Sequence, residues 1–264
     1  MGVEHATQAI QDETYRKALV DLLFQLADDE LFIGHRDSEW LGLAPGIEED
    51  VAFSSVAQDE VGHGLYYLER LTDLGEQEPN VLAFTRQPSQ RRNAVLLERP
   101  NGDWAYTIAR HYFYDLFDDV RLEALSHSSY QPLAQAVTKI KREEYYHLLH
   151  FELWFTRLGA AGGEAQQRME AAIEAIWPEI GGLFTLGVHE EVLVKHGIIP
   201  IDSKELRQRW EERVRPAFDK AGLTWPGEIP NNFLNGREGQ HTEQCEELIQ
   251  TMSEVYRLDP TAKW

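Results

Sequence analysis

The chain has 264 residues, and its 25 Lys and Arg against 45 Asp and Glu give a formal net charge of -20. Hydrophobic residues make up 42% of the chain, which excludes a disordered protein and indicates one large domain or two small ones. A surface this acidic repels phosphate backbones, so we expect no nucleic-acid partner. No apolar run approaches the roughly 18 residues that span a bilayer, and the N-terminus does not resemble a signal peptide. We therefore expect no membrane partner and a cytoplasmic location.

The first two thirds of the chain are predicted to form long helices, because apolar residues recur there at three- and four-residue spacing. Asp103 is expected to cap one of these helices, and glycine- and proline-containing stretches at 42–46, 75–102 and 159–163 separate them. The predicted helices cover residues 15–35, 48–74, 103–127, 131–158 and 164–186, followed by helices at 203–221 and 240–258 with loops at 198–201 and 224–235.

Two of the predicted helices carry a Glu-x-x-His pair on an apolar seam. The pairs are Glu60 with His63 and Glu144 with His147. Residues three apart on a helix share a face, so each pair is directed toward the core. A buried carboxylate is normally paired, protonated or bound to a metal ion.

The two remaining long helices of this set also place a carboxylate on an apolar seam, Glu30 in one and Asp115 in the other. Glu30 precedes Glu60 by 30 residues, and Asp115 precedes Glu144 by 29. This order matches the ferritin-like plan, in which two helices give one acidic residue each and two give Glu-x-x-His. We therefore predict an all-α fold, a ferritin-like four-helix bundle with additional C-terminal helices. We expect a single domain over 1–264, with the bundle core at about 10–190 and the extension at about 191–264.

The predicted metal ligands are Glu30, Glu60, His63, Asp115, Glu144 and His147. Their four carboxylates balance two divalent ions, and hard oxygen donors with one imidazole per ion suit two iron ions, with manganese also possible. Because Cys245 is the only cysteine, the chain has no intrachain disulfide and no cysteine-based zinc or iron–sulfur site.

Each of these assignments has a structural alternative. The two Glu-x-x-His pairs can be satisfied core ion pairs, and the acidic ligand on 103–127 can be one of three neighbours of Asp115. A surface or core role is favoured for three other histidines near the site. A third Glu-x-x-His match, Glu238 with His241, lies off any apolar seam and is interpreted as coincidental. The neighbouring acids are Asp118, Asp119 and Glu123, and the three histidines are His35, His111 and His150.

Two groups of basic residues could meet the phosphates of a coenzyme A thioester, although a solvated surface is the favoured interpretation. They are Lys139, Lys141 and Arg142 in one group, and Arg86, Arg91 and Arg92 in the other.

The chain resembles the PaaC-like proteins of phenylacetyl-CoA epoxidase, the multicomponent phenylacetate ring-oxygenase, over essentially its whole length. The resemblance is carried by SEWLGLAPGIEEDVA from Ser38, RPNGDWAYTIARHYFYD from Arg99, KREEYYHLLHFE from Lys141 and GQHTE from Gly239. It implies a complex in which the di-iron centre belongs to a related, larger catalytic ferritin-like subunit. It also implies small accessory subunits, an electron-donating reductase and an aromatic acyl-CoA as substrate in aerobic phenylacetate catabolism.

The sequence departs from that family in one respect. Many PaaC-like proteins have lost the first Glu-x-x-His and serve as structural partners, whereas this chain keeps Glu60 and His63. We therefore expect an epoxidase subunit that retains a carboxylate/His di-iron site for dioxygen activation.

Two alternatives stay open at this point. The first is a docking subunit with a vestigial or structural metal, which exposed apolar stripes on the helices at 48–74 and 103–127 would support. The second is a stand-alone ferroxidase or catalase, which the extra C-terminal third disfavours.

Overall fold

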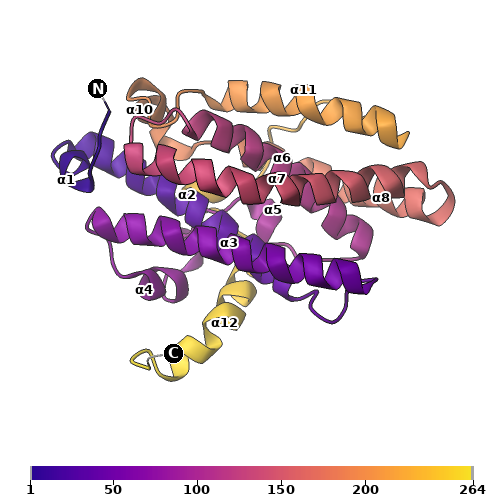
Figure 1. Cartoon of the computed structure of the whole chain (residues 1–264), viewed down its shortest axis with the longest axis horizontal. Helices are drawn as coiled ribbons and strands as arrows, with labels where there is room; N and C mark the ends of the chain where they lie inside the picture. Colours follow the sequence, from indigo (N-terminus) through magenta and orange to yellow (C-terminus); the bar gives the residue numbers. More distant parts are fainter. Residues whose placement is uncertain (1, 263–264) are drawn as a thin grey trace. The chain divides into compact units, whose positions relative to one another are not determined.

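The computed structural model describes residues 2–262. Within these residues the regular structure is helical, and the one β-type pairing is an isolated bridge between Val3 and Tyr130. The expected all-α, ferritin-like class is confirmed, and Figure 1 shows the helices in chain order. Among the described residues, no helix is both long enough and apolar enough to cross a bilayer.

The chain divides into two compact units. The first comprises residues 1–19 and 101–233, and the second comprises residues 20–100 and 234–264. The boundary therefore falls inside the helix α2 (Glu13–Ser38). The expected single domain stays a prediction.

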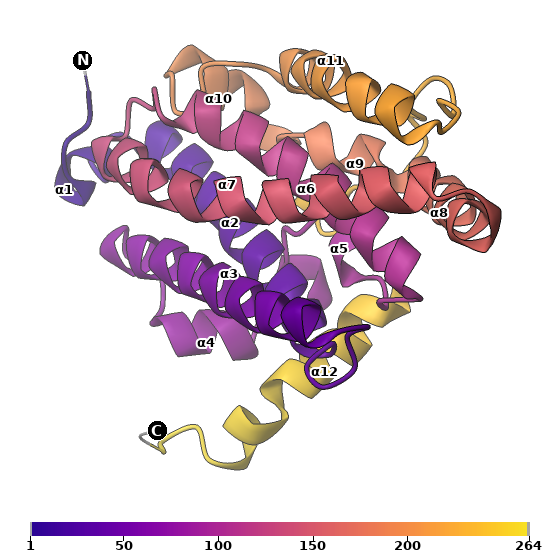
Figure 2. The same cartoon turned by 45° about the vertical axis from the view of Figure 1, so that its right-hand side comes forward.

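The second unit contains most of α2 and one further long helix, with the C-terminal helix packed against three of its short elements. The long helix α3 begins directly after Pro45 and Gly46, and α12 contacts α4, η1 and α5 (Figure 2). The elements after α2 are α3 (Ile47–Asp73), α4 (Pro79–Phe84), η1 (Pro88–Gln90), α5 (Val95–Glu98), η4 (Gly236–Glu238) and α12 (Glu243–Leu258).

The first unit is built on two long helices, α6 (Trp104–Leu125) and α7 (Gln131–Ala160), against which α8 (Gly163–Ile176) and α11 (Ser203–Ala221) pack (Figure 1). Asp103 caps α6 as predicted, because its side chain accepts a hydrogen bond from Tyr106 N at 2.9 Å. The elements are α1 (Ala6–Ala9), α6 (Trp104–Leu125), α7 (Gln131–Ala160), α8 (Gly163–Ile176), η2 (Trp177–Glu179), α9 (Gly181–Phe184), η3 (Gly187–His189), α10 (Glu190–Lys195) and α11 (Ser203–Ala221).

An aromatic cluster fills the core of the first unit. Phe113 of α6 lies 5.7 Å from Trp210 of α11 and 5.6 Å from Phe155 of α7, measured between ring centroids. Trp210 also donates its indole N–H to the Phe113 carbonyl at 2.9 Å. This bond satisfies a buried polar group and fixes α11 on α6.

The structure differs from the predicted helices in several places, and α1 and α10 lie where no helix was predicted. The helix expected at 164–186 ends at Ile176, and the separate elements η2 and α9 follow it. The helix breaks there because Pro178 lacks the N–H that an unbroken helix needs. The stretch 75–102, expected to be irregular, contains α4, η1 and α5. The last helix begins at Glu243 rather than at residue 240.

Candidate functional site

In the second unit, α2 and α3 bring three predicted ligands together. Glu30 comes from α2, and Glu60 and His63 come from α3; ligand atoms of the three side chains lie within 4.8 Å of one another. His63 Nδ1 is 3.5 Å from Glu30 Oε2. The three residues are at most 4% exposed, so this half of the predicted site is a buried group of two carboxylates and one imidazole.

Two glycines allow α2 and α3 to approach closely beside these ligands. A Cβ at Gly34 would lie 2.9 Å from Glu60 Cβ, and a Cβ at Gly64 would lie 3.4 Å from Glu30 Cβ and 3.1 Å from Leu31 Cγ. Each glycine follows the glutamate of its own helix by one turn and packs against the glutamate of the other helix. The pattern Glu-x-x-x-Gly occurs on both helices in the sequence, but these glycines were not predicted to be part of the site.

The chemistry of this group fits a metal ion. Glu30 Oε2 has no hydrogen-bond partner among the described residues, and its ion pair within them is with His63, not with a Lys or Arg. Leaving a carboxylate charged and unneutralised in a protein interior costs several kcal/mol. A divalent cation held by Glu30, Glu60 and His63 would remove that cost, with oxygen and nitrogen donors that suit iron or manganese.

In the first unit, α6 and α7 carry the other three predicted ligands. Asp115 lies on α6, Glu144 and His147 lie on α7, and all three are buried. His147 Nδ1 is 3.3 Å from Glu144 Oε1. Asp115 and His147 belong to no group of three or more mutually close ligand atoms among the described residues. The six-residue ligand set therefore stays a prediction.

The neighbours of Asp115 are engaged elsewhere. Asp118 pairs with Arg121, with Arg121 Nε at 2.8 Å from Asp118 Oδ1, and Asp119 pairs with Lys141 and Arg213. Glu123 is exposed. Asp115 is thus the acid of α6 that best suits the role of a metal ligand.

Burial, with a smaller contribution from the nearby Glu144 carboxylate, raises the pKa of Asp115 to about 6 even though His111 and His147 lower it. His111 Nδ1 lies 3.3 Å from Asp115 Oδ1, and the His111 ring stacks on Phe151 with centroids 4.0 Å apart. His111 is therefore a buried neighbour of a predicted ligand, and its i, i+4 spacing from Asp115 could have revealed this contact.

The other two histidines agree with the surface or core role that the sequence favoured. His35 is partly buried, and burial lowers its pKa while Glu39 raises it. His150 packs edge-on against the ring of Phe151.

The interpretation of Glu238 and His241 as a coincidental match agrees with their contacts. Glu238 accepts a hydrogen bond from Asn235 Nδ2 at 3.0 Å, whereas His241 Nδ1 lies 2.8 Å from Glu98 Oε2. Sequence reasoning missed Glu98, which is buried in α5 and 143 residues away from His241.

Glu98, His241 and Cys245 also place ligand atoms within 4.8 Å of one another, but their bonds describe a structural network rather than a metal site. Glu98 Oε1 accepts from Thr242 N at 2.8 Å and Thr242 Oγ1 at 2.7 Å, so the carboxylate is already satisfied. Burial and the Glu98 carboxylate raise the pKa of the Cys245 thiol well above its usual range, which keeps it protonated and a poor ligand.

The two basic groups have structural or surface roles. Arg86 and Arg91 are buried and pair with Asp28, and Arg92 pairs with Asp21, so neither a coenzyme A contact nor a solvated surface describes Arg86 and Arg91. Lys139 is exposed and pairs with Glu143 of its own helix, as expected for a surface residue.

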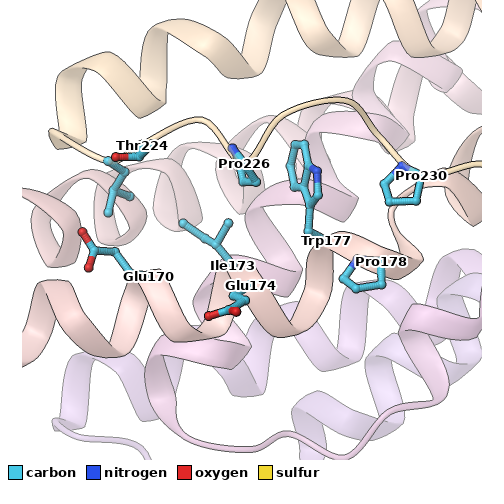
Figure 3. A pocket seen from close by; sticks show the side chains of 9 residues that line it. Glu170, Ile173, Glu174, Trp177, Pro178, Thr224, Pro226 and Pro230 are labelled. Carbon is cyan, nitrogen blue, oxygen red and sulfur yellow. The ribbon is translucent and has the colours of Figure 1, made fainter.

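The first unit has an apolar groove between α8, η2 and the loop after α11 (Figure 3). Its volume is about 470 Å³, and it includes none of the six predicted ligands. Ile173, Trp177 and three prolines form its walls, and the carboxylates of Glu170 and Glu174 stand on its α8 side. These negative charges disfavour the phosphates of coenzyme A, so the groove does not suit a coenzyme A thioester.

Comparison with known proteins agrees with the predicted resemblance. Two components of the 1,2-phenylacetyl-CoA epoxidase of Escherichia coli (strain K12) are similar to this chain. The chain is 33% identical over 241 residues to the component designated C, which covers 91% of this chain and 96% of that protein. It is 27% identical over 222 residues to the component designated A, covering 81% of this chain and 70% of that protein. The family model described as phenylacetic acid catabolic protein matches residues 3–264. The chain therefore belongs to this family of phenylacetic acid catabolic proteins.

Proposed function

We propose that the chain is a subunit of a phenylacetyl-CoA ring 1,2-epoxidase in aerobic phenylacetate catabolism and that it holds two iron ions. The observation that carries the proposal is the buried group of Glu30, Glu60 and His63, in which Glu30 has no Lys or Arg partner among the described residues. The similarity to both epoxidase components supports the reaction class.

In this proposal the iron ligands are the six residues predicted from the sequence. They are Glu30, Glu60, His63, Asp115, Glu144 and His147. The four carboxylates of this set would neutralise two divalent ions, and the burial of the residues would limit the access of water to bound iron. When bound, the iron would supply the dioxygen chemistry that no side chain of the set can perform. Electrons would come from a separate reductase, and the substrate would be an aromatic acyl-CoA.

The test is the iron content of protein purified without oxygen and loaded with ferrous iron. We expect about two irons per chain in the wild type, following the ferritin-like plan. Glu60→Ala should lose this iron. Glu238→Ala is the matched control, since Glu238 belongs to the third Glu-x-x-His match but bonds to Asn235. Equal iron loss in both variants, or no iron in the wild type, would contradict the proposal.

A docking role is the second candidate, and exposed apolar residues on two helices favour it. On α3, Ile47, Val51, Val61 and Leu65 are each at least 44% exposed and fall within about 80° of one another around the helix. On α7, the exposed residues Tyr145, Tyr146, Leu149 and Leu153 span about 100°. Such stripes are typical of helix faces that a partner covers.

The other stripe that would support docking, on the helix at 103–127, is not found. Nearly all of α6 is buried, and none of its large apolar residues is exposed among the described residues. The exposed stripe of the first unit lies on α7 instead. We infer that the related catalytic component of the epoxidase binds to these faces. Leu149→Asp should then prevent co-purification with that component when the two are co-expressed.

A further inference from the structure

Three consecutive acidic residues on α2 have different partners. Asp28, Asp29 and Glu30 are each at most 1% exposed. Successive residues of a helix point about 100° apart, so the three carboxylates leave α2 in three directions. Glu30 lies against His63 of α3, whereas Asp28 and Asp29 each face arginines.

Asp29 is held by a bidentate ion pair with Arg237 of η4. Arg237 Nη1 lies 2.7 Å from Asp29 Oδ1, and Arg237 Nη2 lies 2.8 Å from Asp29 Oδ2. Ala94 N also donates to Asp29 Oδ1 at 2.9 Å. A bidentate guanidinium–carboxylate pair fixes orientation as well as distance, so Arg237 restricts the rotation of α2 at the residue before Glu30.

Asp28 provides a second attachment at the adjacent position. Its carboxylate pairs with Arg86 and Arg91 and accepts a bond from Arg92 N at 2.8 Å. Two neighbouring side chains of α2 are therefore tied, in different directions, to other segments of the second unit. Asp28 is tied to the stretch between α4 and α5, and Asp29 is tied both to that stretch and to η4.

The backbone around Arg237 is shaped to bring it into this position. A Cβ at Gly236 would lie 2.0 Å from the Asn93 carbonyl oxygen, and a Cβ at Gly239 would lie 2.3 Å from the Ser89 carbonyl oxygen. Gly239 also has a φ of 78°, which glycine adopts without strain. Only glycine at both positions allows η4 to lie this close to the 89–93 segment and to direct Arg237 onto Asp29.

We propose that Arg237 is a positioning residue for the metal ligand Glu30, an inference that rests on the proposed function. A rotation of α2 by about 10° moves an atom about 5–6 Å from the helix axis by about 1 Å. Functional constellations need placement within about 0.5 Å. The Asp29–Arg237 pair prevents such a rotation and thereby keeps the Glu30 carboxylate beside His63.

The experiment compares the wild type with Arg237→Lys, Asp29→Asn and Glu98→Gln. Lysine keeps the charge of Arg237 but cannot form the bidentate pair. Asp29→Asn keeps the size of the side chain and serves as the second variant if Arg237→Lys does not fold. Glu98→Gln is the matched control, because it weakens the attachment of the same C-terminal segment through His241 and Thr242 without touching the Asp29 carboxylate.

Two quantities are measured on full-length apo protein. Ferrous iron titrated without oxygen gives the binding affinity, and the visible absorption of bound Co²⁺ reports the ligand geometry. Urea unfolding gives the stability of each variant. We expect Arg237→Lys and Asp29→Asn to bind iron about 10–100-fold more weakly, as for other residues that orient metal ligands, and to change the Co²⁺ spectrum. Glu98→Gln should lose stability but keep wild-type affinity and spectrum.

The outcomes separate the two proposals. A wild type that binds neither iron nor Co²⁺ would overturn both. Unchanged affinity in folded Arg237→Lys and Asp29→Asn, beside a wild type that binds iron, would overturn the positioning role alone. Equal weakening in Glu98→Gln would also overturn it, because general loosening of the C-terminal segment would then explain the effect.

Discussion

Asp115 and Asp118 are both buried in α6, one turn apart, yet their replacement by asparagine should change stability in opposite directions. Burial raises the pKa of Asp115 from 3.8 to about 6. Because each unit of pKa corresponds to about 1.4 kcal/mol, the ionised carboxylate costs the apo protein about 3 kcal/mol at pH 7. Asp115→Asn removes the charge and keeps an acceptor for His111, so the apo variant should be more stable by up to about 3 kcal/mol.

The pH dependence follows from the sign of this difference. Between pH 3.8 and about 6 the folded protein binds the Asp115 proton more tightly than the unfolded chain, so this group makes stability fall as the pH rises. The advantage of Asp115→Asn should be small near pH 4 and complete at pH 7. In the presence of ferrous iron the order should reverse, since the variant loses a proposed ligand and with it the stabilisation by bound metal.

Urea unfolding followed by tryptophan fluorescence is a suitable assay, because the first unit holds five of the seven tryptophans. Asp118→Asn is the control. It takes the carboxylate away from the buried Arg121, and breaking such a pair costs about 3–5 kcal/mol. An Asp115→Asn apo protein that is less stable than the wild type at pH 7, or whose difference does not change with pH, would refute this reasoning.

Two further predictions concern the second unit. Hydrogen bonds from His241 and Thr242 outweigh burial and hold the pKa of Glu98 below its usual value, so Glu98→Gln should cost about 3–5 kcal/mol of stability at pH 7. The difference in stability from the wild type should be complete above about pH 4.5 and shrink as the pH falls below it. Urea unfolding at several pH values measures this difference. Gly34→Ala should destabilise by about 1–3 kcal/mol and weaken iron binding, because its Cβ would lie 2.9 Å from Glu60 Cβ. Gly62→Ala on the exposed side of α3, where a Cβ meets no atom within 4 Å, should instead stabilise by up to about 1 kcal/mol, and equal thermal shifts in the two alanine variants would contradict the packing argument.

The long helices and several of their buried side chains could be predicted from the sequence because helical periodicity is a local property. The three- and four-residue spacing located α2, α3, α6 and α7 to within a few residues, and the seam positions identified Glu60 and His63 as buried side chains. The i, i+3 relation alone places these two side chains on one face of α3. The cap of α6 by Asp103 was likewise fixed by its local surroundings.

The tertiary structure decided which buried carboxylates of α2 face arginines and which faces a histidine. Periodicity gives the direction in which a side chain leaves its helix, but not the partner that meets it there. Arg237 reaches Asp29 across 208 residues of sequence, and His241 reaches Glu98 across 143. Such pairs depend on how distant segments pack, and no local pattern records them. For this reason three adjacent acids on α2 look equivalent in the sequence. In the structure Asp28 and Asp29 pair with distant arginines, whereas Glu30 faces His63.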